Sequence, residues 1–384
     1  MSKWKMVRLG DVAEISSGGT PSRSVLEYWQ NGTIPWVKIG DIKEKYISRT
    51  GEMITELGLK NSSAKIIPKG ALLYTIFATL GEVGILNIDA TTNQAIAGIQ
   101  FSDIVNPNYA YYFLKSLKKS VEAIGRGVAQ NNINQYILKN ILIPLPPLDE
   151  QKRIADVLDK ASELIKKRKE QIRLMDELAK SLFIEMFGDP VENPMGWNVK
   201  KLGDLAHIET GGTPARINAN NYSDTGIPWV KTGEIAAGYI LSTEERITEL
   251  GMENSNCKLL PVNTILLAMY GQGITRGKVG LLKIVATTNQ ACAAILPNES
   301  YSSEYLLQLL DLCYNNLREL SRGGNQPNLN LTIVKEYNVP LAPLLLQNEF
   351  ADRIDAIEQQ KALLQNGLTK METAYKALMQ EYFG

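Results

Sequence analysis

The chain repeats itself, and this repetition limits what it can fold into more than any other feature. Four motifs recur with a constant offset of 193 residues: LGD, GGTP, IPWVK and ITELG, which begin at 9, 18, 34 and 54. After an insertion of three residues the offset is 196, from ATTNQA at 90–95 to EMFG at 185–188, which returns as EYFG. A constant offset over half of the chain indicates tandem duplication of a whole unit. Two similar units on one chain predict a target that is itself bipartite or quasi-symmetric.

The length and the cysteines set the broad class of protein. A chain of 384 residues is long enough for two or three domains that each bury a core. The start, MSKWKMVRLGD, lacks the apolar stretch of a signal peptide, and no run approaches the roughly 18 apolar residues of a membrane span. Cys257, Cys292 and Cys313 all lie in the second copy and have no counterparts in the first. We therefore expect free thiols and a cytoplasmic protein.

The formal charge is zero overall but uneven between the copies. Residues 1–148 carry 16 Lys and Arg against 11 Asp and Glu, whereas residues 197–343 carry 12 against 13. A protein that holds DNA alone is usually basic. If this chain binds DNA, we expect it to bind weakly alone, or with help from a more basic partner.

The first part of each copy predicts a mixed α+β globule. Short β-rich runs, ALLYTIF at 71–77 and TILLAMY at 264–270, lie between glycines and prolines. One amphipathic helix is expected at 108–124, and its counterpart at 303–320. Each globule ends in a proline-rich segment that predicts an extended strap, because proline fixes φ and disfavours helix before it.

The second part of each copy predicts a long helix. In both, one set of positions recurs at alternating steps of four and three residues, which is typical of a coiled coil. The positions are Ile154, Leu158, Ala161, Ile165, Arg168, Ile172, Met175, Ala179 and Leu182, and then Phe350, Ile354, Ile357, Lys361, Leu364, Leu368, Met371, Tyr375 and Leu378. Arg168 and Lys361 are the two charged interruptions of this seam. The alternative is an amphipathic helix that packs only on its own globule.

The order of the parts predicts how the helices would pair. The first helix leads from the first globule to the second, and the second helix starts at the second globule. A paired second helix must therefore run back, which gives an antiparallel, pseudo-twofold pair. The seam spans roughly 42 Å, which corresponds to on the order of 12 base pairs of B-DNA.

The ordered motifs resemble a known family. The sequence has LGD, a GGTP-x-R turn, IPWVK-x-G-[DE]-I and TTNQA, followed by QNNINQYILKNILIPLPPLDEQKRIADVLD at 130–159 and FGDP-x-x-NP-x-GW at 187–197. This pattern is similar to the specificity subunits of type I restriction–modification enzymes, and it covers essentially the whole chain. The second copy departs from it at 340–354, where PLAPLLLQNEFADRI replaces PLPPLDEQKRIADVL.

The resemblance implies an organisation and a set of partners. It implies a target recognition domain at 1–146, a central helix at 147–188, a second target recognition domain with its linker at 189–343, and a second helix at 344–384. Each domain would read one half of a split DNA site, and the helices would set the spacer. Two methyltransferase subunits would dock on the helices, with S-adenosylmethionine and ATP bound by partner subunits, which include translocation and cleavage subunits. The chain itself would hold no cofactor.

The residues show no convincing active site. The four-residue motif of amino-methyltransferases and the GxxxxGK[ST] phosphate loop do not occur in the sequence. The single histidine, His207, lies in an apolar, strand-like run and is expected to be structural rather than catalytic. The three cysteines lack the spacing of metal ligands. We therefore expect a DNA-recognition subunit that performs no catalysis. The alternatives are a coiled-coil scaffold for ligands other than DNA, or a small methyltransferase with an unfamiliar motif.

Candidate DNA contacts come from the glycine turns, from the IPWVK lysines, and from regions where the copies differ. The turns could approach a phosphate, although a tight structural turn explains them equally well. The insertion loop after residue 268 and the Asn/Gln-rich segments at 126–134 and 322–330 offer groups for base edges, but a solvent-exposed hairpin and helix caps are the alternatives. The candidates are Thr20, Arg23, Lys38, Thr79, Arg126, Gln130, Asn132, Thr213, Arg216, Lys231, Tyr270, Gln272, Thr275, Arg276, Lys278, Arg322, Asn325 and Gln326. Trp36 and Trp229 are expected in the core, and Asn93, Gln94, Asn289 and Gln290 are expected to be structural.

Overall fold

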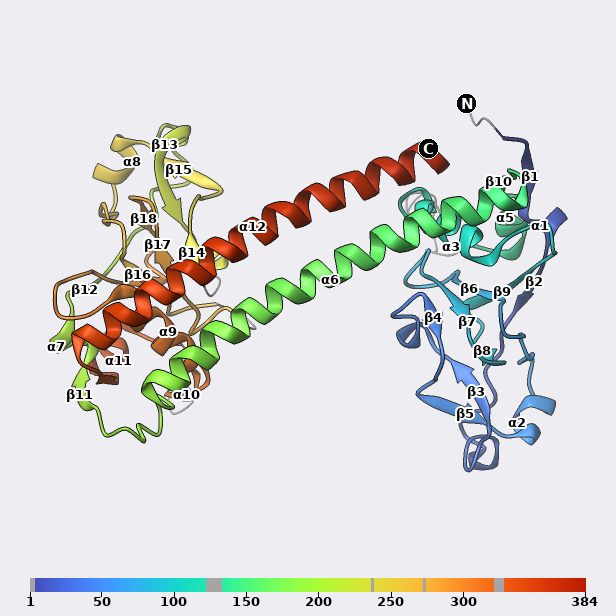
Figure 1. Cartoon of the computed structure of the whole chain (residues 1–384), viewed down its shortest axis with the longest axis horizontal. Coiled ribbons are helices and arrows are strands. Elements are labelled where there is room, and N and C mark those ends of the chain that lie inside the picture. The colour runs from blue at the N-terminus through green and yellow to red at the C-terminus, as the bar shows by residue number, and fades with distance from the viewer. Residues whose placement is uncertain (1–3, 122–132, 236–237, 272–273, 321–327) are drawn as a thin grey trace. The chain divides into compact units, whose positions relative to one another are not determined.

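The computed structural model describes residues 4–121, 133–235, 238–271, 274–320 and 328–384 (Figure 1). The chain forms two compact units. The first comprises Met1–Lys169 with Gly367–Gly384, and the second comprises Glu170–Asn366. Each unit therefore contains one globule, the first part of one long helix and the last part of the other.

The two globules contain the same series of elements. The strands and helices of the first are β1 (Met6–Arg8), α1 (Leu9–Val12), β2 (Ala13–Ser17), β3 (Ile34–Val37), β4 (Tyr46–Ile47), β5 (Glu52–Ile54), α2 (Glu56–Lys60), β6 (Leu72–Thr75), β7 (Val83–Leu86), β8 (Thr91–Thr92), β9 (Ile96–Phe101), α3 (Pro107–Ser116), α5 (Gln135–Asn140) and β10 (Leu142–Pro144). Those of the second are β11 (Asn198–Lys201), α7 (Leu202–Leu205), β12 (Ile208–Thr210), β13 (Tyr222–Val230), β14 (Tyr239–Ile240), β15 (Glu245–Ile247), α8 (Glu249–Glu253), β16 (Ile265–Ala268), β17 (Val279–Leu282), β18 (Thr287–Thr288), β19 (Cys292–Ile295), α9 (Ser303–Leu312), α10 (Tyr314–Leu320), α11 (Leu331–Glu336) and β20 (Asn338–Leu341).

The duplication extends to the sheet topology. The five-stranded sheets have the orders β2-β9-β6-β7-β4 and β12-β19-β16-β17-β14, and the three-stranded sheets have the orders β5-β3-β8 and β15-β13-β18. The central strands β6 and β16 are buried along their whole length. Alternate residues of β6 enter different cores: Leu72 and Tyr74 enter one, and Leu73 enters the other. Both faces of the strand are covered, which explains why its sequence is continuously apolar.

The expected amphipathic helices are present, but each is interrupted at one residue; in the first copy residues 118–121 are again helical after the break. Helix α3 ends at Ser116, with Leu117 as its C-cap, and the counterpart is split into α9 and α10 at Cys313. The Leu117 amide donates to the Leu114 carbonyl, three residues earlier, which tightens the last turn of α3. The Cys313 amide donates to the Leu309 carbonyl, four residues earlier, at the end of α9.

A buried glutamine fixes the first turn of each long helix to its own globule. Helix α6 (Leu148–Phe187) carries Gln151 and helix α12 (Leu344–Phe383) carries Gln347, and both side chains are fully buried. The Gln151 Oε1 atom accepts from the Asn106 amide at 2.8 Å, and its Nε2 atom donates to the carbonyls of Ile104 and Pro146. The Gln347 amide bridges Ser302 and Ala342 in the same way. The first turn of each long helix therefore docks on its globule in the same way in both copies. This holds even though the second copy departs in sequence from the first at 340–354.

The extended strap before each helix is also fixed by equivalent bonds. Strand β10 pairs with β1, and β20 pairs with β11. The buried hydroxyl of Tyr109 donates to the Pro144 carbonyl at 2.8 Å, and that of Tyr305 donates to the Pro340 carbonyl at 2.9 Å. The proline-rich straps are thus extended, as predicted, and their carbonyls have partners despite burial.

Burial along the two long helices follows the alternating four-and-three pattern. Every seam position is buried or half-buried, whereas most positions between them are exposed. In unit 1, Lys169 of α6 pairs with Glu372 of α12 at 2.8 Å; in unit 2, Asp176, further along α6, pairs with Lys361, earlier in α12, at 2.6 Å. The numbering runs in opposite directions, so the helices are antiparallel. The α+β class, with two tandem copies and a pair of antiparallel helices, is confirmed.

The two charged residues in the seam are accommodated differently. The Lys361 side chain is only 12 % exposed and contacts both Asp176 and Glu358. Burial alone would lower the pKa of Lys361, but the hydrogen bond with Asp176 and the charge of Glu358 raise it above its ordinary value. The Arg168 guanidinium lies against Gly367, where a Cβ atom would overlap it. A glycine inside α12, which is unfavourable for a helix, thus makes room for an arginine of α6.

Among the described helices, none combines the length and apolar character that a membrane crossing needs.

We predict that Gln347→Ala destabilises the protein by about 1–3 kcal/mol, because it leaves a buried amide and a buried carbonyl without partners. Urea denaturation of the whole chain measures this. Gln360→Ala removes an exposed glutamine from the same helix and is the control. Equal midpoints for the two variants would contradict the role of Gln347.

Candidate nucleic-acid interface

The two glycine turns pack tightly against the ATTNQA segments. The amide of Gly19 donates to the Thr92 carbonyl at 2.8 Å, and that of Gly212 donates to the Thr288 carbonyl at 3.0 Å. A Cβ atom on either glycine would overlap protein backbone. Glycine is therefore required here by close packing, and these two amides already have acceptors. The geometry favours the structural reading of the turns over a phosphate cradle.

The tryptophans of the IPWVK motifs hold these turns in place. Trp36 and Trp229 are 2 % exposed, so both lie in the core as expected. The indole N–H of Trp36 donates to the Gly19 carbonyl and that of Trp229 donates to the Gly212 carbonyl, each at 3.0 Å. Strands β3 and β13 thus place the residue that follows them, Lys38 or Lys231, beside a rigid turn.

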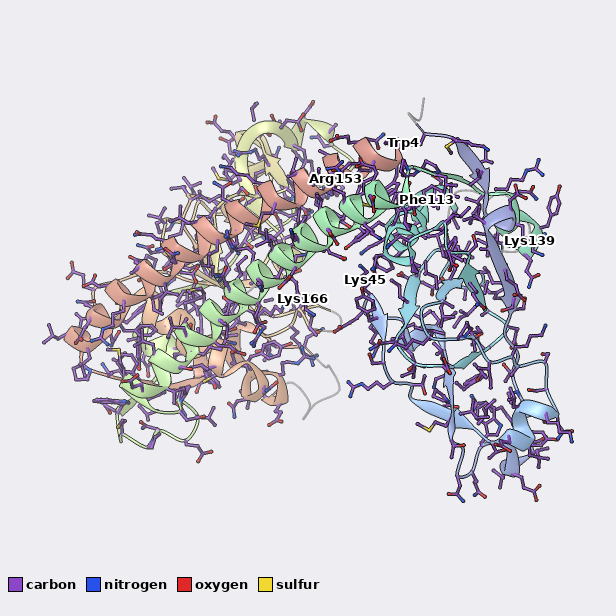
Figure 2. The ribbon with its side chains drawn as sticks, turned by 45° about the vertical axis from the view of Figure 1, so that its right-hand side comes forward. Trp4, Lys45, Phe113, Lys139, Arg153 and Lys166 are labelled. Carbon is purple, nitrogen blue, oxygen red and sulfur yellow. The ribbon has the colours of Figure 1, made fainter. Side chains whose placement is uncertain are left out.

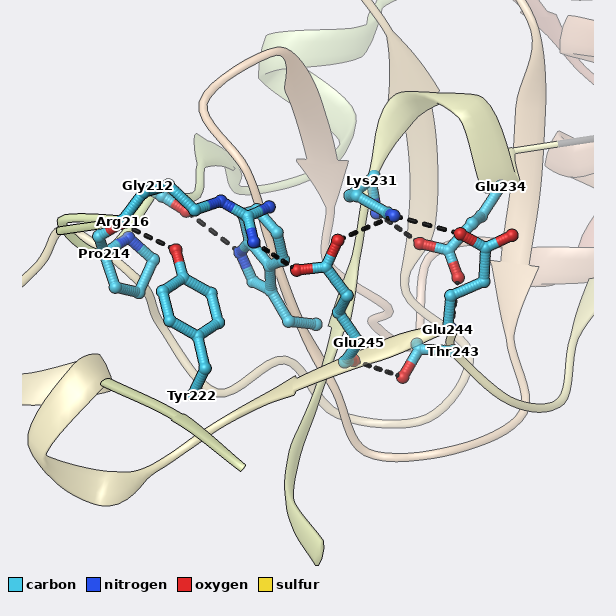
Figure 3. A network of polar contacts seen from close by, with 10 residues as sticks. Gly212, Pro214, Arg216, Tyr222, Lys231, Glu234, Thr243, Glu244 and Glu245 are labelled. Atoms are coloured by element: carbon cyan, nitrogen blue, oxygen red, sulfur yellow. Dashed lines mark hydrogen bonds and ion pairs between the residues drawn. The ribbon is translucent and has the colours of Figure 1, made fainter. Parts of the chain in front are cut away.

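An ion-pair cluster surrounds each turn, and Figure 3 shows the second one. Glu245 accepts from Arg216, and its other oxygen lies 2.8 Å from the Lys231 Nζ atom. The Arg216 guanidinium lies 4.6 Å from the centre of the Tyr222 ring. In the first copy Glu52 binds Arg23 and Lys38, and the Arg23 guanidinium lies 3.6 Å from the centre of the Trp29 ring. Four predicted DNA contacts therefore already have protein partners.

These contacts change the proton affinity of the central carboxylates. Hydrogen bonds from Arg216 and then Lys231 lower the pKa of Glu245 to about 2, and hydrogen bonds from Arg23 and Lys38 lower that of Glu52. The hydrogen bond to Glu245 also raises the pKa of Lys231. In the first copy two cations face one anion, whereas in the second copy Lys231 also contacts Glu244 at 3.0 Å, so two cations face two anions.

A threonine follows each glycine pair and orients a glutamine. The Thr20 hydroxyl donates to the Gln94 Oε1 atom, and the Thr213 hydroxyl donates to the Gln290 Oε1 atom, each at 2.5 Å. Both glutamines are exposed. This bond uses the amide oxygen of each glutamine, so the amide nitrogen is the group suited to donate to a ligand. The neighbouring asparagines cap their own turns, with Asn93 accepting from Ala95 and Asn289 from Ala291, which is the structural role expected of them.

The end of the central strand lies next to that glutamine turn. The Ile76 amide donates to the Ala95 carbonyl at 2.9 Å, and the Met269 amide donates to the Ala291 carbonyl at 2.8 Å. The aromatic residue that follows, Phe77 or Tyr270, is exposed. Sequence reasoning chose Tyr270 but missed Phe77, which occupies the same place at an offset of 193 residues.

The described ends of the two Asn/Gln-rich segments bond to the same residues, Ile76 and Met269. Arg126, Gln130, Asn132, Arg322, Asn325, Gln326 and, in the insertion loop, Gln272 lie outside the described residues. Immediately after the gaps, the Ile133 amide donates to the Ile76 carbonyl at 2.9 Å and the Leu329 amide donates to the Met269 carbonyl at 3.1 Å. Asn134 and Asn330 then cap α5 and α11. We call this place the hairpin edge; it comprises Thr20, Phe77, Gln94 and Ile133 in unit 1 and Thr213, Tyr270, Gln290 and Leu329 in unit 2.

The other candidate DNA contacts in the two hairpins make hydrogen bonds within their own domain. The Thr79 carbonyl accepts from the Thr75 hydroxyl. In the insertion loop, the Arg276 carbonyl accepts from Arg318, and the Lys278 amide donates to the Thr275 carbonyl. Arg276 is half-buried and its Nε atom has no hydrogen-bond partner within the described ranges. Residues 274–276 of the loop are thus bonded to α10, through Tyr314 and Arg318.

Several lysines of unit 1 that the second copy lacks lie beside α6, together with four carboxylates, Glu44, Glu82, Asp159 and Glu163. A groove there is lined by five lysines whose counterparts in the second copy are neutral or acidic. They are Lys43, Lys45, Lys115, Lys118 and Lys166, against Ala236, Gly238, Asp311, Tyr314 and Ala362. Figure 2 labels two of them; Lys45 pairs with Asp159 of α6, and Lys166 lies 3.8 Å from Glu44. Burial lowers the pKa of Lys45.

The histidine and the cysteines give no reactive cluster. His207, which the sequence predicts to be structural, has a side chain that is 69 % exposed and lies 3.4 Å from Glu209; an apolar neighbourhood in the sequence does not show which face a residue takes. The cysteines are free and buried, and burial raises the pKa of Cys292 to about 12 and that of Cys313 to about 11. Within the described residues no group of His, Cys, Asp and Glu could hold a metal ion.

Comparison with known proteins identifies the family. The family described as "Type I restriction modification DNA specificity domain" matches residues 1–174 and 194–373. The chain belongs to this family. The matches cover both copies, so each copy is one such domain. The function read from the sequence, a DNA sequence-specificity subunit of a type I restriction–modification system, is confirmed, and neither alternative is favoured.

Relatives of similar length support this. The chain is 28 % identical over 368 residues to the MjaIX specificity subunit of Methanocaldococcus jannaschii, covering 90 % of this chain and 85 % of the relative. It is 25 % identical over 401 residues to the MjaVIII specificity subunit of the same organism, covering 98 % and 91 %.

Solved structures share the fold. The crystal structure of the S subunit from M. genitalium matches with a TM-score of 0.63 at 16 % identity, covering 100 % of this chain and 96 % of that one. A chain from a study of the assembly and conformational transition of the type I system matches with a TM-score of 0.59 at 19 % identity, covering 99 % and 97 %.

The pKa of Glu245 predicts a pH dependence. Its folded-state pKa of about 2 lies below the ordinary 4.5, so the Glu245 contacts stabilise the fold above pH 4.5 and are lost as the pH falls towards 2. Glu245→Gln should lower the thermal midpoint at neutral pH, and this difference from the unmodified chain should shrink below pH 4.5. Glu244→Gln, which loses one exposed contact to Lys231, is the control and should have a smaller effect. A difference that stays constant down to pH 3 would contradict the ion-pair account.

Proposed function

We propose that each domain of this specificity subunit reads one half of a bipartite DNA site. The observation that carries the proposal is the duplicated hairpin edge, where the same backbone bonds present different side chains. Equivalent turns, glutamines and ion-pair clusters support equivalent docking, and the differing residues Phe77 and Tyr270 support unlike half-sites. Phosphate contacts position a protein on DNA, while base contacts specify the sequence.

We propose further that the helices set the spacer between the half-sites. Antiparallel pairing of α6 and α12, each leading from its own copy of the repeat, supports half-sites in inverted orientation. Helices fixed to their globules by Gln151 and Gln347 support a spacing that does not vary. The seam of roughly 42 Å corresponds to on the order of 12 base pairs.

The catalytic steps belong, in this proposal, to partner subunits. Two methyltransferase subunits would dock on the helices, would bind S-adenosylmethionine and would methylate adenine; translocation and cleavage subunits would use ATP. The lack of a methyltransferase motif and of a phosphate loop in the sequence supports a chain that performs no catalysis and holds no cofactor. A formal charge of zero supports dependence on partners for DNA affinity. We place this assembly in the cytoplasm, together with its DNA.

A domain exchange tests the proposal. Replacing residues 197–341 by residues 1–145 gives two copies of the first domain on the same pair of helices. Co-expressed with the modification subunits of its own system, this variant should methylate a split palindrome, two inverted copies of the first half-site, in methylation-sensitive sequencing of host DNA.

The unmodified chain is the control and should give two unlike half-sites. An exchanged variant that forms the complex but methylates the original sequence would contradict half-site recognition by the domains. Methyl transfer by the purified chain alone, at the rate of the complex, would show that it is an enzyme.

A further inference from the structure

Two exposed aromatic rings occupy the same place in the two domains. Phe77 is 49 % exposed and Tyr270 is 38 % exposed, although each lies two residues beyond the end of a strand whose residues are all buried. A ring left half in water forgoes part of the stabilisation that burial provides. The duplication kept an aromatic residue here, while the loop that follows changed in both length and sequence.

The backbone turns away immediately after each ring. The next residue has a positive φ in both copies: 61° for Ala78 and 148° for Gly271. Alanine in this region is strained by about 1–2 kcal/mol, and the fold holds it there through the hairpin. The Gly81 amide donates to the Thr75 carbonyl at 3.1 Å, and the Gly277 amide donates to the Ala268 carbonyl at 2.8 Å. The same closure therefore projects a ring outwards from two otherwise different loops.

The Phe77 and Tyr270 rings lie near polar groups that could hydrogen-bond to DNA. Each follows a residue that is bonded both to the glutamine turn, through Ala95 or Ala291, and to the end of the Asn/Gln-rich segment. Gln94 and Gln290 are exposed and bond threonine through their amide oxygens, so their amide nitrogens are donors that fit a phosphate oxygen or a base-edge acceptor. A flat apolar ring beside outward donors matches the edge of a base pair, where a thymine methyl group lies next to hydrogen-bonding atoms.

We propose that the rings of Phe77 and Tyr270 contact bases of the first and the second half-site, respectively. This inference rests on the proposed function and adds the residues that make the contact. The Phe77 ring offers only an apolar surface, whereas Tyr270 also offers a hydroxyl group that donates or accepts a hydrogen bond. Equivalent rings of different chemistry then make the two halves of the target different at equivalent positions.

Single-ring variants in the full complex test this. Phe77→Ala and Tyr270→Ala are assembled with the modification subunits, and methylation rates are measured on duplexes in which one base pair of one half-site is changed at a time. Phe77→Ala should lower the rate on the cognate duplex by roughly tenfold or more. It should also reduce discrimination at one position of the first half-site and leave the second half-site unchanged. Tyr270→Ala should do the reverse.

A matched control and a conservative pair separate recognition from folding. Ile104→Ala removes an exposed apolar side chain next to the strap, where the Ile104 carbonyl binds Gln151, and should leave rate and discrimination unchanged. Phe77→Tyr and Tyr270→Phe keep the ring and should fold even if the alanine variants do not. Each should change the base preference at one position of its own half-site.

Two results would overturn the proposal. One is unchanged discrimination at both half-sites by assembled alanine and conservative variants, while the domain exchange still alters the target; half-site recognition would then stand without these rings. The other is loss of subunit assembly with unaltered discrimination in the complex that remains, which would show that the rings contact a protein partner. If the domain exchange also leaves the target unchanged, the proposed function itself fails.

Discussion

Each long helix is anchored to its own globule by one buried amide, and the rest of the arrangement depends on this. Gln151 and Gln347 each satisfy an amide of the globule and a carbonyl of the strap at the point where the helix begins. Because an unpaired buried polar group costs about 1–3 kcal/mol, the first turn cannot shift without loss of stability. The direction of each helix is therefore fixed relative to its own globule, and a seam of alternating four and three residues can then select the partner helix.

Polar groups are also paired with one another on the surface expected to contact DNA. Arg23, Lys38 and their counterparts pair with Glu52 and Glu245, and Lys231 also pairs with Glu244, so carboxylates offset the positive charge of both turns. Aromatic rings beneath the arginines hold the cations in place. DNA recognition then depends more on the shape and the hydrogen-bond donors of the hairpin edge than on long-range electrostatic attraction to DNA. This fits a subunit that gains much of its DNA affinity from partners.

The sequence predicts well the features that recur with a period. Because each of them occurs twice, the sequence shows the duplication, the α+β globules, the straps and the seam. The family match covers both copies. The exposure of Phe77 and of His207 is not visible, since both lie in apolar runs and their exposure is decided by the turn or strand that positions them. The roles of Gln151 and Gln347 depend on groups far away in the chain. An alignment of the two copies does pair Gln151 with Gln347 and Phe77 with Tyr270, and this is the signal that could have found them.

The central claim is that paired helices hold two reading domains at a set distance, and lengthening both helices tests it most directly. One heptad inserted after Ile172 in α6 and one after Asn366 in α12 leaves the Lys169–Glu372 and Asp176–Lys361 pairs intact and adds about 10 Å. The account predicts that methylation-sensitive sequencing will find the same two half-sites with a spacer longer by about three base pairs. Methylation of the original spacing alone, by a correctly assembled complex, would contradict it.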